Sequence, residues 1–161
     1  MELYEKMWQM NFLQEFLSNK ILLSSCAGWC IAQVLKTFIH LFITREFVAE
    51  RLVGGGGMPS SHSATVCALS TATFIEYGVG SFEFAMAFTF SVIVMYDAMG
   101  VRRETGIHSK VLNELLKIIE DMGSDMSPQD KLREFIGHTP LQVVIGAILG
   151  IVIAITTCLM L

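Results

Sequence analysis

The chain has 161 residues, and its length fits a single domain. Hydrophobic residues make up 53% of it and charged residues only 16%, a composition too apolar for an ordinary soluble domain. The formal net charge of −4 offers no basic surface of the kind that binds nucleic acid. Because the apolar residues lie in long blocks, we expect one all-α membrane domain over residues 1–161, a polytopic bundle of helices.

The first segment, residues 1–19, mixes aromatic and aliphatic side chains with charges, which predicts an amphipathic helix at the membrane interface. Its start lacks the basic region of a cleaved signal peptide, so we expect the N-terminus to be mature. About four membrane-spanning helices are then predicted from the apolar blocks, at 20–43, 62–79, 82–99 and 140–161. The second and third blocks are short and carry acidic residues, so their ends are expected to lie among other helices.

Two polar stretches, 44–61 and 100–139, connect these blocks on one predicted side of the membrane. Most basic side chains fall in these stretches, while only Lys6 and Lys20 fall on the opposite side. The positive-inside rule therefore places both stretches in the cytoplasm. We expect a multi-pass protein of a bacterial plasma membrane.

The longer polar stretch predicts two short cytoplasmic helices. Its apolar periodicity favours one helix over 108–122. The pair Ser127-Pro128 is typical of an N-cap followed by proline at the first helical position, and predicts a second helix that ends near residue 136.

The segment from Gly54 to Ala64 reads Gly-Gly-Gly-Gly-Met-Pro-Ser-Ser-His-Ser-Ala and stands directly before the second apolar block. The glycine run, which ends at Gly57, lets backbone N–H groups approach an anion closely. The helix that follows adds unpaired N–H donors and the positive end of its macrodipole. His62 can exchange a proton near neutral pH. The order of these residues suits a site for phosphate chemistry. The alternative is that they only begin a helix and bind no ligand.

A second histidine motif, Gly-His-Thr-Pro-Leu-Gln-Val at 137–143, leads into the last apolar block on the same predicted side. A phosphoryl group held between His62 and His138 would meet a nucleophile on one side and a proton donor on the other. The alternative interpretation is purely structural. Thr139 is a good N-cap and Gln142 stands at the third helical position, which together predict a capping box.

The first apolar block contains Lys36, with Gln33 and His40 on the same predicted helix face. A lysine within a span normally faces a polar cavity or a partner. We expect Lys36 to contact phosphate. Alternatively, its long side chain reaches the membrane surface, since the end of the span is only about two turns away.

The third apolar block ends in Asp97, closely followed by Arg102 and Arg103. As parts of a site, the arginines would neutralise phosphate charge, and Asp97 would orient a histidine or bind a cation. As parts of the scaffold, Asp97 would pair with an arginine at the helix end, and the arginines would meet anionic lipid.

The four cysteines all fall inside predicted spans, with neither disulfide nor zinc spacing. We expect them to be small buried residues in a reducing or lipid setting. The sequence predicts no metal and no cofactor.

Three motifs carry a resemblance to a known family: residues 56–64, residues 94–103 (Val-Met-Tyr-Asp-Ala-Met-Gly-Val-Arg-Arg) and residues 137–143. They closely resemble the divergent branch of the type-2 phosphatidic acid phosphatase family, which is related to acid phosphatases and vanadium-dependent haloperoxidases. The resemblance covers nearly the whole chain, including Ala32-Gln33 and Lys36.

The resemblance implies a role for each matched residue. Ser60 and Ser61 would contact phosphate, His62 would be the general acid, and His138 would be the nucleophile that forms a phosphohistidine. Lys36 would take the part of the lysine in the family's first motif.

Two positions depart from the pattern of the wider family. Gln142 stands where that family has a carboxylate after its nucleophile, and Leu132 stands where it has an arginine. Glutamine still accepts a hydrogen bond from a histidine N–H, but stabilises an imidazolium less than a carboxylate does. Arg102 or Arg103 would substitute for the arginine, and Asp97 for the carboxylate.

From residues and resemblance together, we expect an integral membrane phosphatase that acts on a lipid phosphomonoester at the cytoplasmic face. Phosphatidate, phosphatidylglycerophosphate and polyprenyl phosphate are the candidate substrates, and membrane lipids are the surrounding partners. The alternatives are a lipid-phosphate binding or transport protein without catalysis, and a structural membrane partner. Because four short spans make a small cavity wall, self-association into a homodimer is also an expectation.

Overall fold

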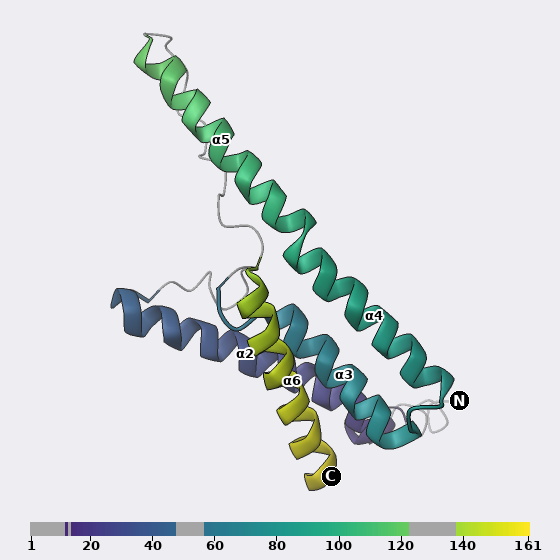
Figure 1. Ribbon diagram of the computed structural model, residues 1–161. Helices are drawn as coiled ribbons and strands as arrows, with labels where there is room; N and C mark the ends of the chain where they lie inside the picture. The colour runs from purple at the N-terminus through teal and green to yellow at the C-terminus, as the bar shows by residue number, and fades with distance from the viewer. Residues whose placement is uncertain (1–11, 13, 48–56, 123–137) are drawn as a thin grey trace, which may run out of the picture.

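The computed structural model describes residue 12 and residues 14–47, 57–122 and 138–161. The main helices are α2 (Lys20–Thr44), α3 (Ser61–Tyr77), α4 (Phe82–Met99), α5 (Val101–Asp121) and α6 (Pro140–Met160) (Figure 1). The described part of the chain contains helices and no strand, which confirms the all-α class. The ends of α2, α4 and α6 fall within one residue of the predicted spans.

Two predicted helices fall largely or wholly outside the described residues. Of the interfacial helix over 1–19, residues 14–18 are described and are helical. The helix predicted from Ser127 to about residue 136 lies outside the described part entirely.

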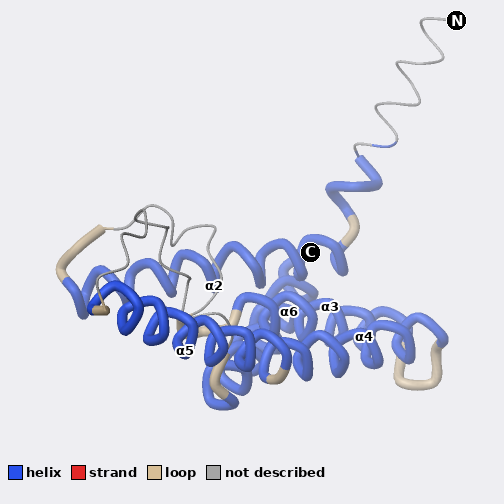
Figure 2. The backbone as a smooth tube through the Cα atoms, turned by 90° about the horizontal axis from the view of Figure 1, so that it is seen from above, coloured by secondary structure: helices blue, strands red, loops and turns tan. Residues whose placement is uncertain are grey.

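Helix α3 is the centre of the bundle, and α2, α4 and α6 all pack against it. In Figure 2, α2 and α4 lie on opposite sides of it. Its buried face carries small side chains at every fourth position, at Ala64, Ala68 and Ala72. Small residues in this spacing let helix backbones approach closely, as they do in membrane bundles.

Glycines on the neighbouring helices complete this close packing. A Cβ atom built on Gly146 of α6 would collide with the carbonyl oxygen of Ser60, and one on Gly150 with that of Ala64. A Cβ atom on Gly28 of α2 would lie 2.9 Å from the same Ala64 oxygen. The three helices therefore touch through their main chains, and the absence of a side chain at these glycines is what permits the contact.

Three helical stretches are long and apolar enough to cross a membrane: α2, the continuous stretch Phe82–Ile119, and α6. Helix α3 was also predicted as a span, and it has 17 residues, many of them serine, threonine or alanine. Because the other helices surround α3, it can form without an apolar outer surface. The count of four spans stays a prediction.

Helix α5 begins earlier than the predicted boundary at residue 108. It starts at Val101, immediately after Gly100, and prolongs α4 so that the two form one long rod in Figure 1. Among the described helices, α5 packs only against α4. Its large apolar side chains stay about half exposed. The apolar periodicity of this stretch predicted the helix correctly but missed about its first two turns.

Candidate functional site

The glycine-rich motif forms the start of α3. Gly57 has a φ of 80°, a left-handed conformation that favours glycine at this position. Ser60 is the N-cap of α3, and its hydroxyl oxygen accepts hydrogen bonds from the Ser63 N–H at 3.4 Å and the Ser63 hydroxyl at 3.1 Å. The N–H groups of Ser61 and His62, in the first turn, lie beyond the reach of intrahelical acceptors. A helix start with such donors is suited to an anion.

The second histidine motif forms the start of α6. Thr139 is its N-cap and Pro140 its first residue, and the capping box with Gln142 is present, which confirms the predicted cap. His138 precedes the cap, and its backbone N–H donates to the carbonyl oxygen of Ala98, near the end of α4, at 3.1 Å. The end of α4 therefore helps to hold His138 in place.

The starts of α3 and α6 are joined by a main-chain hydrogen bond. The N–H of Ser60 donates to the carbonyl oxygen of Gln142 at 3.1 Å. This bond brings two helix N-termini together, although the two motifs are far apart in the sequence. It also occupies the N–H of Ser60, so the predicted contact between Ser60 and phosphate would have to use the hydroxyl proton.

The two histidines predicted to form the site are close together. The ring centroids of His62 and His138 are 5.9 Å apart and the ring planes meet at 63°. His138 is only 2% exposed, while His62 is partly exposed. A ligand would therefore approach the pair from the side of His62.

Gln142 fixes the protonation of the His138 ring. Its side-chain oxygen Oε1 accepts the backbone N–H of Thr139 at 3.1 Å, which identifies this atom as the amide oxygen. The same oxygen lies 3.2 Å from Nδ1 of His138. Two acceptors do not bond, so Nδ1 must carry a proton, and in the neutral ring the lone pair is then on Nε2. The capping box and the orientation of the histidine thus depend on the same glutamine.

Lys36 lies inside the bundle and not at the membrane surface. It is 2% exposed, and its Nζ donates to Oγ of Ser61 at 3.5 Å. Its side chain thus points at the start of α3, which speaks against the alternative that it reaches out to the membrane surface. Gln33, one turn earlier on α2, is also buried. A buried cation beside a helix N-terminus gives this region a positive potential suited to an anion.

The remaining predicted residues lie near the end of α4. Asp97 is partly buried and immediately precedes Ala98, the residue that holds the backbone of His138. Arg102 and Arg103 belong to the first turn of α5, and their side chains lie outside the described part. Their roles at the site stay predictions.

Sequence reasoning named Gln142 as an acceptor for a histidine N–H, and its side-chain oxygen does lie next to Nδ1 of His138. It missed the carbonyl oxygen of Ala98, which accepts the backbone N–H of His138. This carbonyl is a main-chain group that no side-chain pattern reveals.

The cysteines follow the prediction only in part. Cys67 is buried and Cys158 partly buried, whereas Cys26 and Cys30 are exposed on α2. Helical spacing puts these two on an outer face, where the bilayer would surround them. Among the described residues, no group of three or more histidine, cysteine or acidic side chains is placed to hold a metal ion.

Known proteins resemble this chain over most of its length. A family model described as the Divergent PAP2 family matches residues 17–153. The chain is also 39% identical over 150 residues to a protein of Bacillus subtilis (strain 168) named as the uncharacterized membrane protein YuiD, covering 88% of this chain and 95% of that one. No solved structure matches the chain. The chain is a membrane protein and belongs to the Divergent PAP2 family.

Proposed function

We propose that this protein is an integral membrane phosphatase that hydrolyses a lipid phosphomonoester through a phosphohistidine intermediate. The proposal rests mainly on one observation, the pair of histidine rings 5.9 Å apart where two helix N-termini meet. Two rings this close can both reach one phosphoryl group, because reacting atoms need to be about 3–3.5 Å apart. Membership of a PAP2-related family supports a phosphatase-like chemistry.

In the first step, His138 is the nucleophile. The lone pair on its Nε2 attacks phosphorus, and the bond between phosphorus and the lipid oxygen breaks as the N–P bond forms. His62, in its protonated form, donates its proton to the departing oxygen, so that the lipid leaves as a neutral alcohol. Gln142 keeps the proton on Nδ1 and so keeps Nε2 nucleophilic.

In the second step, water replaces the histidine. The neutral His62 accepts a proton from the water as its oxygen attacks phosphorus, and the N–P bond breaks. Inorganic phosphate is released, and both histidines return to their starting protonation states. His62 thus acts as the general acid in the first step and as the general base in the second.

The charge of the phosphoryl group is balanced by groups already in place. Lys36 places its amino group at a buried position beside the start of α3, which adds N–H donors and a helix dipole. The 3.5 Å contact between Lys36 and Ser61 is long for a hydrogen bond, so a phosphate oxygen can replace it with a shorter one. Lys36 and the start of α3 would thus stabilise the negative charge on the phosphoryl group while His138 attacks phosphorus.

The setting in the membrane supports a lipid as the substrate. Phosphatidate, phosphatidylglycerophosphate and polyprenyl phosphate share a phosphomonoester carried on a hydrocarbon. The site lies where α2 and α4 end and α3 and α6 begin, at one end of the bundle, which fits a headgroup at a membrane surface. Lys110 and Lys117 on α5, which continues beyond this end, support the cytoplasmic side.

The decisive experiment measures phosphate release from a panel of these three lipids by purified protein. The wild type should release phosphate from at least one lipid. His138→Ala and His62→Ala should each lose more than about a hundredfold in rate, the range expected for a nucleophile or a general acid. His108→Ala is the matched control, because His108 is exposed on α5. Full activity in either site variant would overturn the assignment.

A substrate with a better leaving group separates the two histidines. An aryl phosphate needs little protonation of its leaving oxygen, so His62→Ala should form the phosphoenzyme with it while His138→Ala should not. Acid-labile, base-stable phosphate on the His62→Ala protein would identify the phosphohistidine. The same label on His138→Ala would show that a different residue attacks.

The second candidate function is a lipid-phosphate binding or transport protein without catalysis. It is favoured by Gln142, because a neutral amide stabilises an imidazolium less than a carboxylate does. In that case the wild type would bind lipid phosphate in the same site and release none over hours.

A further inference from the structure

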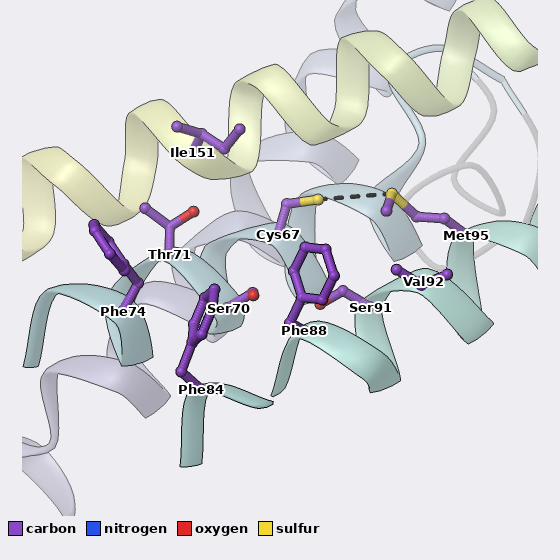
Figure 3. A pocket seen from close by; sticks show the side chains of 10 residues that line it. All are labelled: Cys67, Ser70, Thr71, Phe74, Phe84, Phe88, Ser91, Val92, Met95 and Ile151. Carbon is purple, nitrogen blue, oxygen red and sulfur yellow. Dashed lines mark hydrogen bonds between the residues drawn. The ribbon is translucent and has the colours of Figure 1, made fainter. Parts of the chain in front are cut away.

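An apolar groove of about 240 Å³ lies between α3 and α4, with Ile151 of α6 at its rim (Figure 3). Its floor is formed by Cys67, Ser70 and Ser91, which are buried. Its walls include large apolar side chains that are about half exposed, among them Phe74, Phe88 and Val92. In a membrane, these half-exposed walls face lipid, so the groove is accessible from the bilayer.

The groove contains little that would attract a polar ligand. The Ser91 hydroxyl on its floor already donates to the carbonyl oxygens of Val66 and Ala87, each at 2.7 Å. No charged residue belongs to the described lining. A hydrocarbon is therefore the ligand that this surface fits.

The Cys67 end of the groove is the end nearer to His62 along α3. Cys67 and Met95 close this end, with their sulfur atoms 3.7 Å apart. Cys67 follows His62 on α3 by five residues, about 8 Å along the helix axis. Met95 lies one turn before Ala98, whose carbonyl holds the backbone of His138. The groove and the histidines thus share both of their supporting helices.

The other end of the groove is closed by aromatic rings. Phe74 and Phe84 have ring centroids 5.7 Å apart, as do Phe84 and Phe88 (Figure 3). From Cys67 to Phe74 the groove extends over about 10 Å of α3. Its long direction is that of the helices, away from the site and into the apolar part of the bundle.

We propose that this groove binds a hydrocarbon chain of the lipid whose phosphate lies between the histidines. The inference rests on the proposed function and deepens it, because it makes a bilayer lipid, and not a water-soluble phosphomonoester, the preferred ligand. The chain enters sideways from the membrane between α3 and α4. Its burial adds binding energy at a distance from the reacting phosphorus and positions the headgroup at His138.

Photolabelling tests the groove without any requirement for turnover. The probe is a phosphatidate that carries a diazirine within one acyl chain, bound to the His138→Ala protein in lipid nanodiscs. Label is expected on α3 and α4, and Thr71→Trp, which fills the groove, should reduce it severalfold. The matched control is Ile75→Trp, because Ile75 is exposed on the same helix and does not line the groove. Label concentrated on the outer face of α2, or unaffected by Thr71→Trp, would overturn the inference.

Kinetics supply a second and separate measurement. Thr71→Trp in an otherwise wild-type protein should lower kcat/KM for a long-chain phosphatidate by about tenfold, as expected when about two methylene groups lose their burial. Hydrolysis of an aryl phosphate, which has no chain, should stay unchanged. Equal losses on both substrates would overturn the inference, since they would mean that the tryptophan acts on the fold or on the histidines.

The two measurements distinguish failure of the inference from failure of the proposed function. If the wild type releases no phosphate but the groove is labelled, the proposed hydrolysis fails and the lipid groove stands. If phosphate is released and the label lies elsewhere, the hydrolysis stands and the groove inference fails.

Discussion

The two sides of α3 are built differently. Toward α6, its residues meet glycines, and main-chain atoms of the two helices touch at Gly146 and Gly150. Toward α4, its residues meet phenylalanine rings, and a groove of about 240 Å³ remains between the helices. Close main-chain packing holds the start of α6 in a fixed position, as the proposed reaction between two histidines would require, whereas the looser side leaves room for a ligand.

The largest effect is expected from Gly150→Ala on the close-packed side. Alanine favours a helix by about 1 kcal/mol over glycine, but the new methyl group would collide with the carbonyl oxygen of Ala64. Overpacking of this kind costs about 1–3 kcal/mol, so the melting temperature in detergent should fall together with phosphate release. Gly80→Ala is the control, because nothing lies within 4 Å of a Cβ atom there. Unchanged melting of Gly150→Ala would show that α3 and α6 are not in main-chain contact.

The next largest effect is expected at Lys36, where a substitution should lower activity without lowering stability. In Lys36→Met, a buried charge is replaced by an apolar side chain of similar length, which is often neutral or stabilising. Loss of a charge-assisted contact with phosphate should lower kcat/KM by about tenfold to a hundredfold. Lys110→Met, an exposed position on α5, should change neither quantity. If Lys36→Met were fully active, the polar side of the site would lie elsewhere.

A smaller effect is expected at Gln142, where two substitutions test its contact with His138 in different ways. Gln142→Leu removes the acceptor from Nδ1 of His138 and from the Thr139 N–H, so it should slow hydrolysis and cost about 1 kcal/mol of stability. Gln142→Glu keeps both acceptors and adds a negative charge.

The charge on Gln142→Glu also predicts a change in pH dependence. A carboxylate favours the protonated form of the adjacent imidazole, and the nucleophile must be unprotonated. The rising limb of the pH–rate profile should therefore move to higher pH in Gln142→Glu. A profile identical to that of the wild type would contradict the contact between Gln142 and His138.

The smallest effect is expected at the far end of the α2–α3 contact. There Lys20 and Glu76 form an ion pair with an N–O distance of 3.5 Å, and both side chains are about one-third exposed. Pairs of this kind contribute about 0.2–1 kcal/mol. Lys20→Met should thus barely shift the melting temperature and should leave phosphate release unchanged. A loss as large as that of Gly150→Ala would mean that the ends of the bundle are more strongly coupled than the packing indicates.

Much of this fold follows from local sequence signals. Four helices begin where Asn19, Ser60, Ser81 and Thr139 cap them, and each of these residues caps its helix through a side-chain oxygen. The boundaries of α2, α4 and α6 were therefore predictable to within a residue. The two histidines were recognised because each stands beside such a cap. Local chemistry was sufficient for these features because each capping bond spans only three residues.

The contacts between helices were not predictable in the same way. The bond from Ser60 to Gln142 joins main-chain atoms of residues far apart in sequence, and the roles of Gly146 and Gly150 depend on what lies opposite them. The groove arises from side chains of three helices, which no periodicity along one segment specifies. Exposure of Cys26 and Cys30 was misjudged for the same reason, since it depends on which face of α2 meets α3.

The hydrogen bond between the Ser60 N–H and the Gln142 carbonyl has one more consequence. Because it joins main-chain atoms, any residue other than proline can donate it at position 60, and any residue can accept it at position 142. The spacing of the two helix starts is thus set by main-chain atoms and not by the side chains that line the groove. Under the proposed function, changes to those side chains should alter which lipid binds without moving the two helix starts apart.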